Sequence, residues 1–161
     1  MSPKSAMQTH QFTPPKPSSL SVCGGVIAVW ANILKAVPES RLLLKSKQLL
    51  NEGTKATVLK QFQKQGIESE RISLRAEVDS YQGHLEVYND VDIALDPFPY
   101  NGTTTTLEGL WMGVPIVTLC GDRHACRVGS SILHRVGLDK LIANDFVSYV
   151  GIAQKLANDF S

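Results

Sequence analysis

The segment VDIALDPFPYNGTTTTLEGLWMGVPIV, residues 91–117, joins the pattern of a buried strand to the pattern of a helix. It opens with the apolar run 92–96, and prolines at positions 97 and 99 prevent a strand from continuing. Four threonines follow, and apolar residues then recur at helical spacing at Leu107, Leu110, Trp111 and Val114. We therefore predict a helix that begins within the threonine run and ends at residues 113–115.

The start of this predicted helix has the features of a phosphate site. A helix that follows the carboxyl end of a buried strand points its free N–H groups into the crevice above the sheet. The hydroxyls of Thr103, Thr104 and Thr105 add hydrogen-bond donors, and Gly102 lets the backbone come close to a ligand. Glu108 shares the helix face of Thr104 and Thr105, where its carboxylate suits the two hydroxyls of a ribose. These residues predict a site for a diphosphate joined to a ribose.

Each of these features also has an ordinary structural explanation. Serial threonines can act as a redundant N-cap, and Asn101-Gly102 is a common turn dipeptide. Asn101-Gly102-Thr103 also fits the acceptor sequence for N-glycosylation, although nothing else in the sequence indicates secretion. Glu108 alone is typical of a solvated helix charge. Its position on the threonine face is what favours the ligand interpretation.

Length, charge and cysteine content narrow the class of protein. The 161 residues suffice for one domain with a single core, and a formal net charge of +1 gives no broad basic field for nucleic acid or an anionic membrane. The sequence shows no apolar run of membrane-spanning length and no signal-peptide arrangement at its start. Three cysteines are too few and uneven for a disulfide scaffold. We therefore expect a cytoplasmic protein without nucleic-acid or membrane partners.

Hydrophobic periodicity divides the chain into two parts. Residues 1–21 are rich in Pro, Ser, Thr and Lys without a hydrophobic period, so we expect them to be disordered. Residues 22–161 alternate between two patterns, with strands expected at 41–45, 72–74, 92–96 and 115–119, and helices at 26–37, 57–65, from His84, 103–114, 128–136 and 146–160. This alternation predicts an α/β domain with a Rossmann-like, doubly wound parallel sheet and ligands at the carboxyl ends of its strands.

Several other polar residues are candidates for a ligand role. Lys45 or Lys47 could reach a phosphate from the end of the strand 41–45, although an exposed, solvated lysine is the more common case. Arg127, near the start of a later helix, could steady a phosphate or an acceptor, or simply lie on the surface. The cluster Cys120, His124 and Cys126 lacks a usual zinc spacing and a fourth ligand, so no metal is predicted.

Residues 92–133, DIALDPFPYNGTTTTLEGLWMGVPIVTLCGDRHACRVGSSIL, resemble the C-terminal lobe of the O-GlcNAc transferase family, which includes the SPINDLY-type protein O-glycosyltransferases. The resemblance extends, more weakly, from residue 26 to the C-terminus. It implies a GT-B glycosyltransferase, in which two Rossmann-like lobes face each other and the C-terminal lobe holds the donor. The implied donor is UDP-GlcNAc or a related nucleotide-sugar, used as substrate without a separate cofactor, and the implied acceptor is a protein.

The resemblance also implies roles for individual residues. A family histidine at the position of His84 packs against the uracil of the donor, so His84 is expected to contact the base. Glu108 is expected to hold the ribose, and the diphosphate is assigned to the loop and helix residues Asn101, Gly102, Thr103, Thr104 and Thr105. No catalytic residue is assigned to this chain.

The chain departs from the family pattern in two respects. Active members have an N-terminal lobe with catalytic histidines, usually preceded by tetratricopeptide repeats, and the 161 residues show neither. Ser21 stands where members carry a lysine that neutralises the diphosphate, and losing one such contact costs roughly 1.5 to 3 kcal/mol. We therefore expect a fragment or a diverged relative that alone binds a nucleotide-sugar weakly and transfers nothing. The alternatives are a non-catalytic nucleotide-binding or interaction module and a GT-B-like sugar-nucleotide epimerase.

Overall fold

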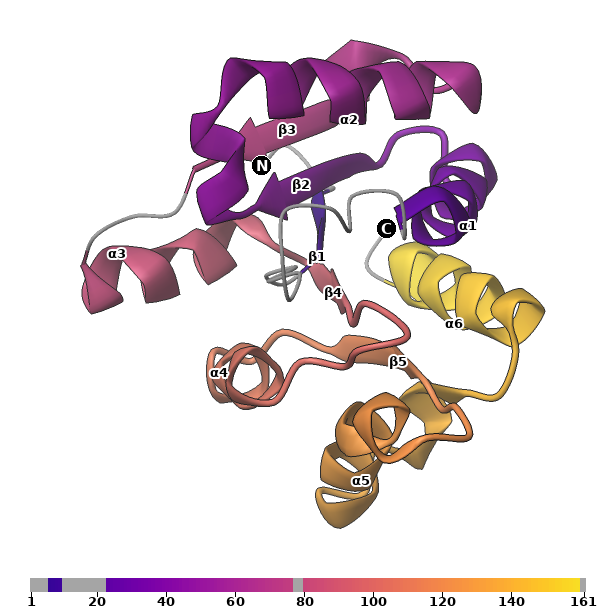
Figure 1. Cartoon of the computed structure of the whole chain (residues 1–161). Coiled ribbons are helices and arrows are strands. Elements are labelled where there is room, and N and C mark those ends of the chain that lie inside the picture. The colour runs from indigo at the N-terminus through magenta and orange to yellow at the C-terminus, as the bar shows by residue number, and fades with distance from the viewer. Residues whose placement is uncertain (1–5, 10–22, 77–79, 160–161) are drawn as a thin grey trace.

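The computed structural model describes residues 6–9, 23–76 and 80–159 (Figure 1). Within these ranges, six parallel strands form a sheet in the order β3-β2-β1-β4-β5-β6. Their bounds are β1 (Ala6–Thr9), β2 (Arg41–Lys45), β3 (Ile72–Arg75), β4 (Ile93–Leu95), β5 (Ile116–Leu119) and β6 (Ile142–Ala143). Met7 of β1 lies in register with Leu42 and Ile93. The first strand is central and the chain winds outward on both sides, which confirms the predicted Rossmann-like sheet.

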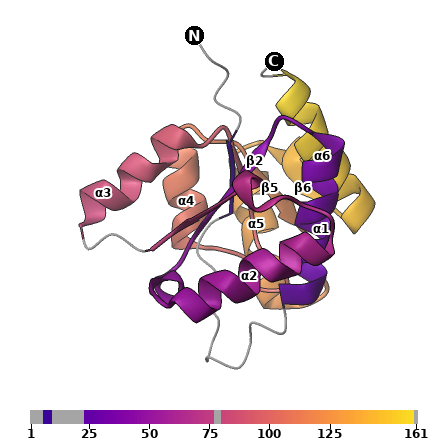
Figure 2. The same cartoon turned by 90° about the horizontal axis from the view of Figure 1, so that it is seen from above.

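Helices cover both faces of this sheet (Figures 1 and 2). The α-helices are α1 (Cys23–Ala36), α2 (Glu52–Lys64), α3 (Tyr81–Glu86), α4 (Thr104–Trp111), α5 (Val128–Arg135) and α6 (Phe146–Asp159). Short 3-10 helices are η2 (Lys47–Leu50), η3 (Ser69–Arg71), η4 (Val87–Asp90), η5 (His124–Cys126) and η6 (Asp139–Leu141). The first, second and last α-helices share one face, and the others lie on the opposite face. In the described ranges, none of these helices could cross a membrane.

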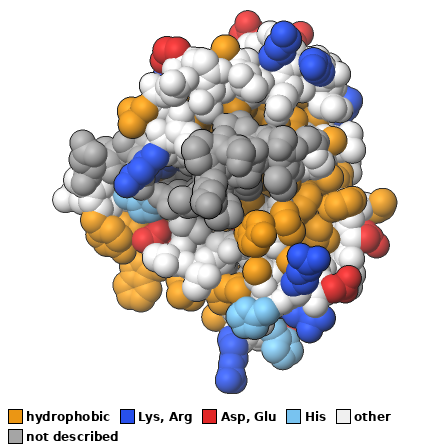
Figure 3. Space-filling model, viewed as in Figure 1, with side chains coloured by type: hydrophobic (Ala, Val, Ile, Leu, Met, Phe, Trp, Pro, Cys, Tyr) orange, Lys and Arg blue, Asp and Glu red, His pale blue; other side chains and the backbone are white. Residues whose placement is uncertain are grey.

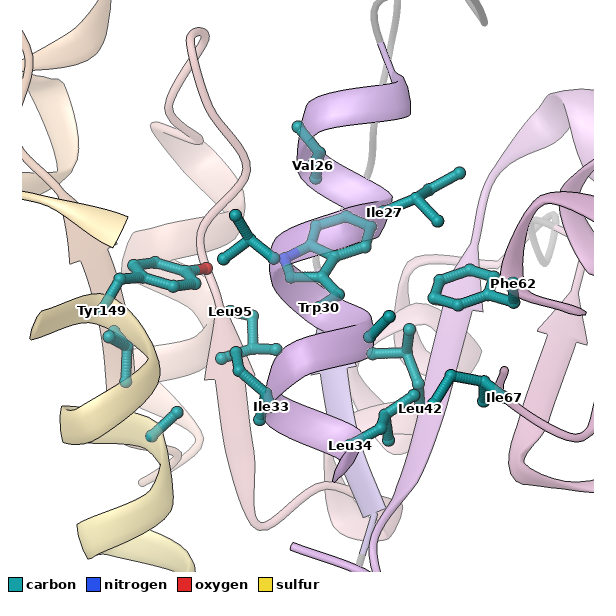
Figure 4. Packing of buried hydrophobic residues seen from close by; sticks show 14 of the residues in the cluster. Val26, Ile27, Trp30, Ile33, Leu34, Leu42, Phe62, Ile67, Leu95 and Tyr149 are labelled. Atoms are coloured by element: carbon teal, nitrogen blue, oxygen red, sulfur yellow. The ribbon is translucent and has the colours of Figure 1, made fainter. Parts of the chain in front are cut away.

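Strand side chains alternate between two hydrophobic clusters, one on each face. In the larger cluster, Trp30 and Ile33 of α1 lie between β2 and Tyr149 of α6 (Figure 4). The smaller cluster joins Leu43 and Ala94 to residues of η4 and α4. Because successive strand residues face opposite sides, Lys45 and Asp96 fall on the same face as Leu43 and Ala94. The alternation therefore aims both polar side chains toward α3 and α4 at the carboxyl edge of the sheet.

The predicted helices are present, but α1, α2 and α3 begin earlier than expected, at Cys23, Glu52 and Tyr81. The strand predicted at 41–45 is β2, and the helix predicted to stop before Pro38 is α1. Helix α2 begins at Glu52 because the side chain of Asn51 accepts a hydrogen bond from the backbone of Thr54. Helix α3 begins at Tyr81 because Ser80 caps it in the same way. Polar caps thus extend both helices beyond their apolar patterns.

Strand β1 departs from the expectation that residues 1–21 are disordered. Ala6–Thr9 pairs with both β2 and β4, in the middle of the sheet. Four residues of mixed polarity carry no hydrophobic period, so this strand depends on neighbours that offer unpaired backbone groups on both sides. The remaining residues of the predicted disordered segment, 1–5 and 10–21, lie outside the described residues.

Candidate functional site

The amino end of α4 lies at the carboxyl edge of the sheet. β4 ends at Leu95, and residues 96–103 turn the chain so that α4 begins at Thr104. Thr103 occupies the N-cap position without a capping hydrogen bond from its side chain, and Thr103 and Thr104 are both exposed. The first N–H groups of a helix have no partner within it, so this end carries a partial positive charge where a ligand can reach it. Such an arrangement can bind phosphate oxygens.

A buried carboxylate fixes the loop that leads into α4. Asp96 is 2% exposed, and its Oδ1 accepts a hydrogen bond from the backbone N–H of Gly102 at 2.7 Å. Its Oδ2 accepts one from the Thr118 hydroxyl at 2.6 Å. Burial raises the pKa of Asp96 to about 7, although both hydrogen bonds act in the opposite direction. The carboxylate therefore ties the threonine loop to β5.

Three helices converge on the same loop. The Tyr149 hydroxyl of α6 donates to the backbone oxygen of Asp96 at 2.9 Å, and burial raises the pKa of Tyr149. The Thr106 hydroxyl of α4 donates to the backbone oxygen of Gly102 at 2.9 Å. In α5, a Cβ on Gly129 would meet the Asp96 carboxylate, so only glycine allows this helix to approach so closely. The position of the threonine helix is thus determined from several sides.

A second polar cluster lies beside α4. The Lys45 ammonium is 2.8 Å from Nδ1 of His84, and Nε2 of His84 is 2.9 Å from Oε2 of Glu108. The three residues come from β2, α3 and α4, and all lie in the interior or close to it. Lys45 is 4% exposed, and the side chains of His84 and Glu108 are each 12% exposed. The cluster joins one positive and one negative charge through an imidazole.

Two tyrosines frame His84. The ring of Tyr81 stacks on the imidazole with centroids 6.5 Å apart, and the ring of Tyr88 meets it edge-on at 6.0 Å. The Tyr88 hydroxyl donates to the backbone oxygen of Thr105 at 3.1 Å, and burial raises the pKa of Tyr88. Tyr81, in contrast, is largely exposed. The tyrosines therefore connect the histidine to the threonine helix on one side and to the surface on the other.

The structure brings most of the predicted site residues together. His84 and Glu108 are in direct contact, and Thr103 and Thr104 form the exposed start of α4. Thr105 is only 9% exposed. In the loop, the backbone N–H of Asn101 donates to the oxygen of Ala125, its side-chain amide donates to Pro97, and its buried Oδ1 has no partner among the described residues. The ligand roles of these residues stay predictions.

One expectation about an individual side chain is wrong. Lys45 was expected to be solvated, yet it is buried against His84, because the strand alternation aims it under α3. On α4, two of the apolar residues whose spacing predicted the helix do not pack inward, since Trp111 is 86% exposed and Leu107 is also exposed. Small residues face inward instead, because α4 packs close to the loop beneath it. Hydrophobic side chains consequently gather on the surface over α3 and α4 (Figure 3).

Asp96 and Thr118 were not predicted as parts of the site. Both follow apolar residues at the carboxyl edge of buried strands, and that position is the signal that could have indicated them. Arg127 is exposed and donates from Nε to the backbone oxygen of Gly121 at 2.9 Å. It binds the turn before α5 rather than the buried polar groups.

Two other features of the described residues do not favour an anion site. No group of three or more His, Cys, Asp and Glu side chains in the described ranges could hold a metal ion. A hollow of about 430 Å³ lies between α2 and β3, at the opposite edge of the sheet from α4. Its lining includes Glu68 and Glu70, whose carboxylates would repel a diphosphate. We therefore place the candidate site at the start of α4.

Comparisons with known proteins show the family and the fold of this chain. The sequence model of glycosyl transferase family 41 matches residues 21–161. A probable UDP-N-acetylglucosamine–peptide N-acetylglucosaminyltransferase SPINDLY of Hordeum vulgare is 45% identical over 136 residues, and that of Arabidopsis thaliana is 44% identical over 134 residues. These alignments cover 84% and 83% of this chain. The UDP-N-acetylglucosamine–peptide N-acetylglucosaminyltransferase of Caenorhabditis elegans is 32% identical over 131 residues.

Solved structures show the same likeness. A variant of the O-GlcNAc transferase of Thermobaculum terrenum superposes with a TM-score of 0.86 at 34% identity, covering 96% of this chain. TarM, at 13% identity and a TM-score of 0.51, shares the fold. The chain spans only 14% of the Hordeum relative, 15% of the Arabidopsis relative and 28% of the Thermobaculum chain.

Proposed function

The chain belongs to glycosyl transferase family 41, and we propose that it binds the UDP-sugar donor of a protein O-linked N-acetylglucosaminyltransferase. The observation that carries this proposal is the exposed start of α4, with uncapped N–H groups, directly beside the cluster of Lys45, His84 and Glu108. A phosphate site and a carboxylate lie on one helix, as a nucleoside diphosphate requires. The name of the relatives supplies the sugar and the peptide acceptor.

In this proposal each part of the nucleotide has its own group. The diphosphate lies against the first N–H groups of α4 and the hydroxyls of Thr103 and Thr104, with Thr105, Asn101 and Gly102 forming the turn behind them. The ribose hydroxyls donate to Glu108, and the base lies near the ring of His84. Lys45 does not serve the diphosphate, because its ammonium is buried against His84. The diphosphate is therefore held mainly by backbone dipoles.

The transfer step belongs to the whole protein in this proposal. Acid–base groups for the acceptor hydroxyl would come from an N-terminal lobe, and tetratricopeptide repeats would present the protein acceptor. The donor lobe contributes the charge stabilisation of the leaving diphosphate. A cytoplasmic location is part of the same proposal and is supported by Cys120 and Cys126, which are free thiols.

Calorimetric titration with UDP tests the diphosphate assignment. We expect Thr104→Ala to weaken UDP binding by roughly 10- to 150-fold, because one hydrogen bond to a charged oxygen is lost. Thr57→Ala is the matched control, since Thr57 is an exposed helical threonine on α2, away from the sheet edge. Equal affinities of the two variants, or no UDP binding by a folded chain, would contradict the assignment.

A comparison of UDP with 2′-deoxy-UDP tests the ribose assignment. We expect the wild-type chain to prefer UDP by roughly 5- to 50-fold, because the missing hydroxyl leaves the Glu108 carboxylate without one donor. The preference should disappear in Glu108→Ala. If Glu108→Ala still prefers UDP over 2′-deoxy-UDP, another group contacts the 2′-hydroxyl.

A further inference from the structure

Lys45 is an unusual residue for the end of a buried strand. Its side chain is 4% exposed, and a buried ammonium is stable only with a close partner. The structure provides Nδ1 of His84 at a distance of 2.8 Å. This contact between a buried lysine and an imidazole lies at the edge of the proposed nucleotide site, next to Glu108.

The chemistry of the three side chains determines where the proton of His84 lies. An ammonium has donors and no acceptor, so Nδ1 must accept the hydrogen bond from Lys45. A neutral imidazole with an accepting Nδ1 carries its proton on Nε2. This N–H is directed at Oε2 of Glu108 at 2.9 Å. The direction of both hydrogen bonds therefore follows from the presence of a lysine beside Nδ1 of His84.

We propose that Lys45 is a positioning residue that fixes the Nε2–H tautomer of His84 and, through it, the orientation of the Glu108 carboxylate toward the ribose. The Nε2–H group donates to Oε2, while Oε1 accepts no hydrogen bond among the described residues and stays available for the hydroxyls of a nucleoside diphosphate. This inference rests on the proposed nucleotide function of Glu108. The vicinal diol of a ribose is the ligand group that such a held carboxylate would recognise.

Nitrogen-15 spectra of the histidine side chains test the tautomer without any ligand. His84 can be assigned by comparison with His84→Gln. We expect the wild-type chain at pH 7.5 to show a proton on Nε2 and none on Nδ1. In Lys45→Met, His84 should lose this preference and show a mixture of Nδ1–H and Nε2–H, because the donor that occupies Nδ1 is gone. Lys45→Arg, which keeps a donor in place, should restore the wild-type behaviour.

Two outcomes would overturn the positioning role. One is a wild-type spectrum with a proton on Nδ1 at pH 7.5, which decides the matter even where Lys45→Met does not fold. The other is a folded Lys45→Met chain in which His84 still carries its proton on Nε2 alone.

Binding measurements separate this inference from the proposed function. We expect Lys45→Met to bind UDP about 10-fold more weakly and to lose the preference for UDP over 2′-deoxy-UDP, with both restored by Lys45→Arg. If UDP binds but the spectra place the proton on Nδ1, the positioning role fails and the nucleotide function stands. If the spectra show the expected tautomer but no variant or wild type binds UDP, the nucleotide function fails instead.

Discussion

Replacing Asp96 by asparagine should remove a pH dependence from the stability of this chain. Burial raises the pKa of Asp96 in the folded chain to about 7 from an ordinary value of 3.8. Between these values the folded chain keeps a proton that the unfolded chain has released. The stability from this group is therefore fully present below pH 3.8 and is lost as the pH rises through about 7.

The size of the effect follows from the two pKa values. With a folded pKa of about 7, the free energy of unfolding should fall by about 1.4 kcal/mol between pH 6 and pH 8. Asparagine cannot titrate, so Asp96→Asn should lack this change while also being less stable overall, because an amide cannot accept from both Gly102 and Thr118.

Urea unfolding of both proteins at pH 6, 7 and 8 measures the difference. The histidines titrate in both chains, so the comparison removes their contribution. Asp122→Asn, a change at an exposed aspartate, is the control and should keep the wild-type dependence. Parallel stability curves for the wild type and Asp96→Asn would contradict a pKa of about 7, because they would show that Asp96 does not change its protonation between pH 6 and pH 8.

Three further substitutions test the packing around the site. Gly129→Ala should destabilise the chain by about 1 to 3 kcal/mol in thermal unfolding, because its Cβ meets the Asp96 carboxylate. The control Gly151→Ala in α6, with open space around it, should be neutral or stabilising. Equal effects of the two substitutions would contradict the close approach of α5. Tyr149→Phe should cost about 1 to 3 kcal/mol in urea unfolding, since a buried backbone oxygen loses its donor, and a cost near zero would contradict that bond. Trp111→Ser should change stability by less than about 0.5 kcal/mol, and a larger loss would show that this indole is buried in solution.

The elements that could be predicted from the sequence are those with a local signal. Short apolar runs bounded by charge or proline indicated β2 and β4, and the threonine run indicated the start of α4. β1 could not be predicted in the same way, because its four residues owe their conformation to two neighbouring strands that are distant in sequence. A helix or strand can be predicted from local sequence only when its own residues show a hydrophobic pattern.

The orientation of α4 shows a second limit of sequence pattern. Its period was predicted, but the face that packs inward carries Thr105, Thr106 and Gly109, whereas Leu107 and Trp111 are exposed. Apolar spacing reports the period of a helix and assumes that the apolar side is buried. Here the close approach of the helix to the loop below it requires small side chains, which the hydrophobic pattern does not reveal.

The polar cluster shows a third limit. His84 and Glu108 were both predicted as ligand residues, yet the sequence did not indicate that they bind each other. The contact between Lys45 and His84 joins residues 39 positions apart, and only the sheet alternation and the placement of α3 create it. The chemistry of the residues was predictable, whereas their mutual contacts depend on the assembled fold.

The most direct test of the account is a titration of the nitrogen-15-labelled chain with UDP, followed through its backbone amide signals. The account predicts the largest shifts at the amides of Thr103, Thr104 and Thr105, with smaller shifts around His84 and Glu108. Shifts confined to residues 63–70, which line the hollow at the opposite edge of the sheet, would contradict it. So would a folded chain whose spectrum does not change with UDP at millimolar concentration.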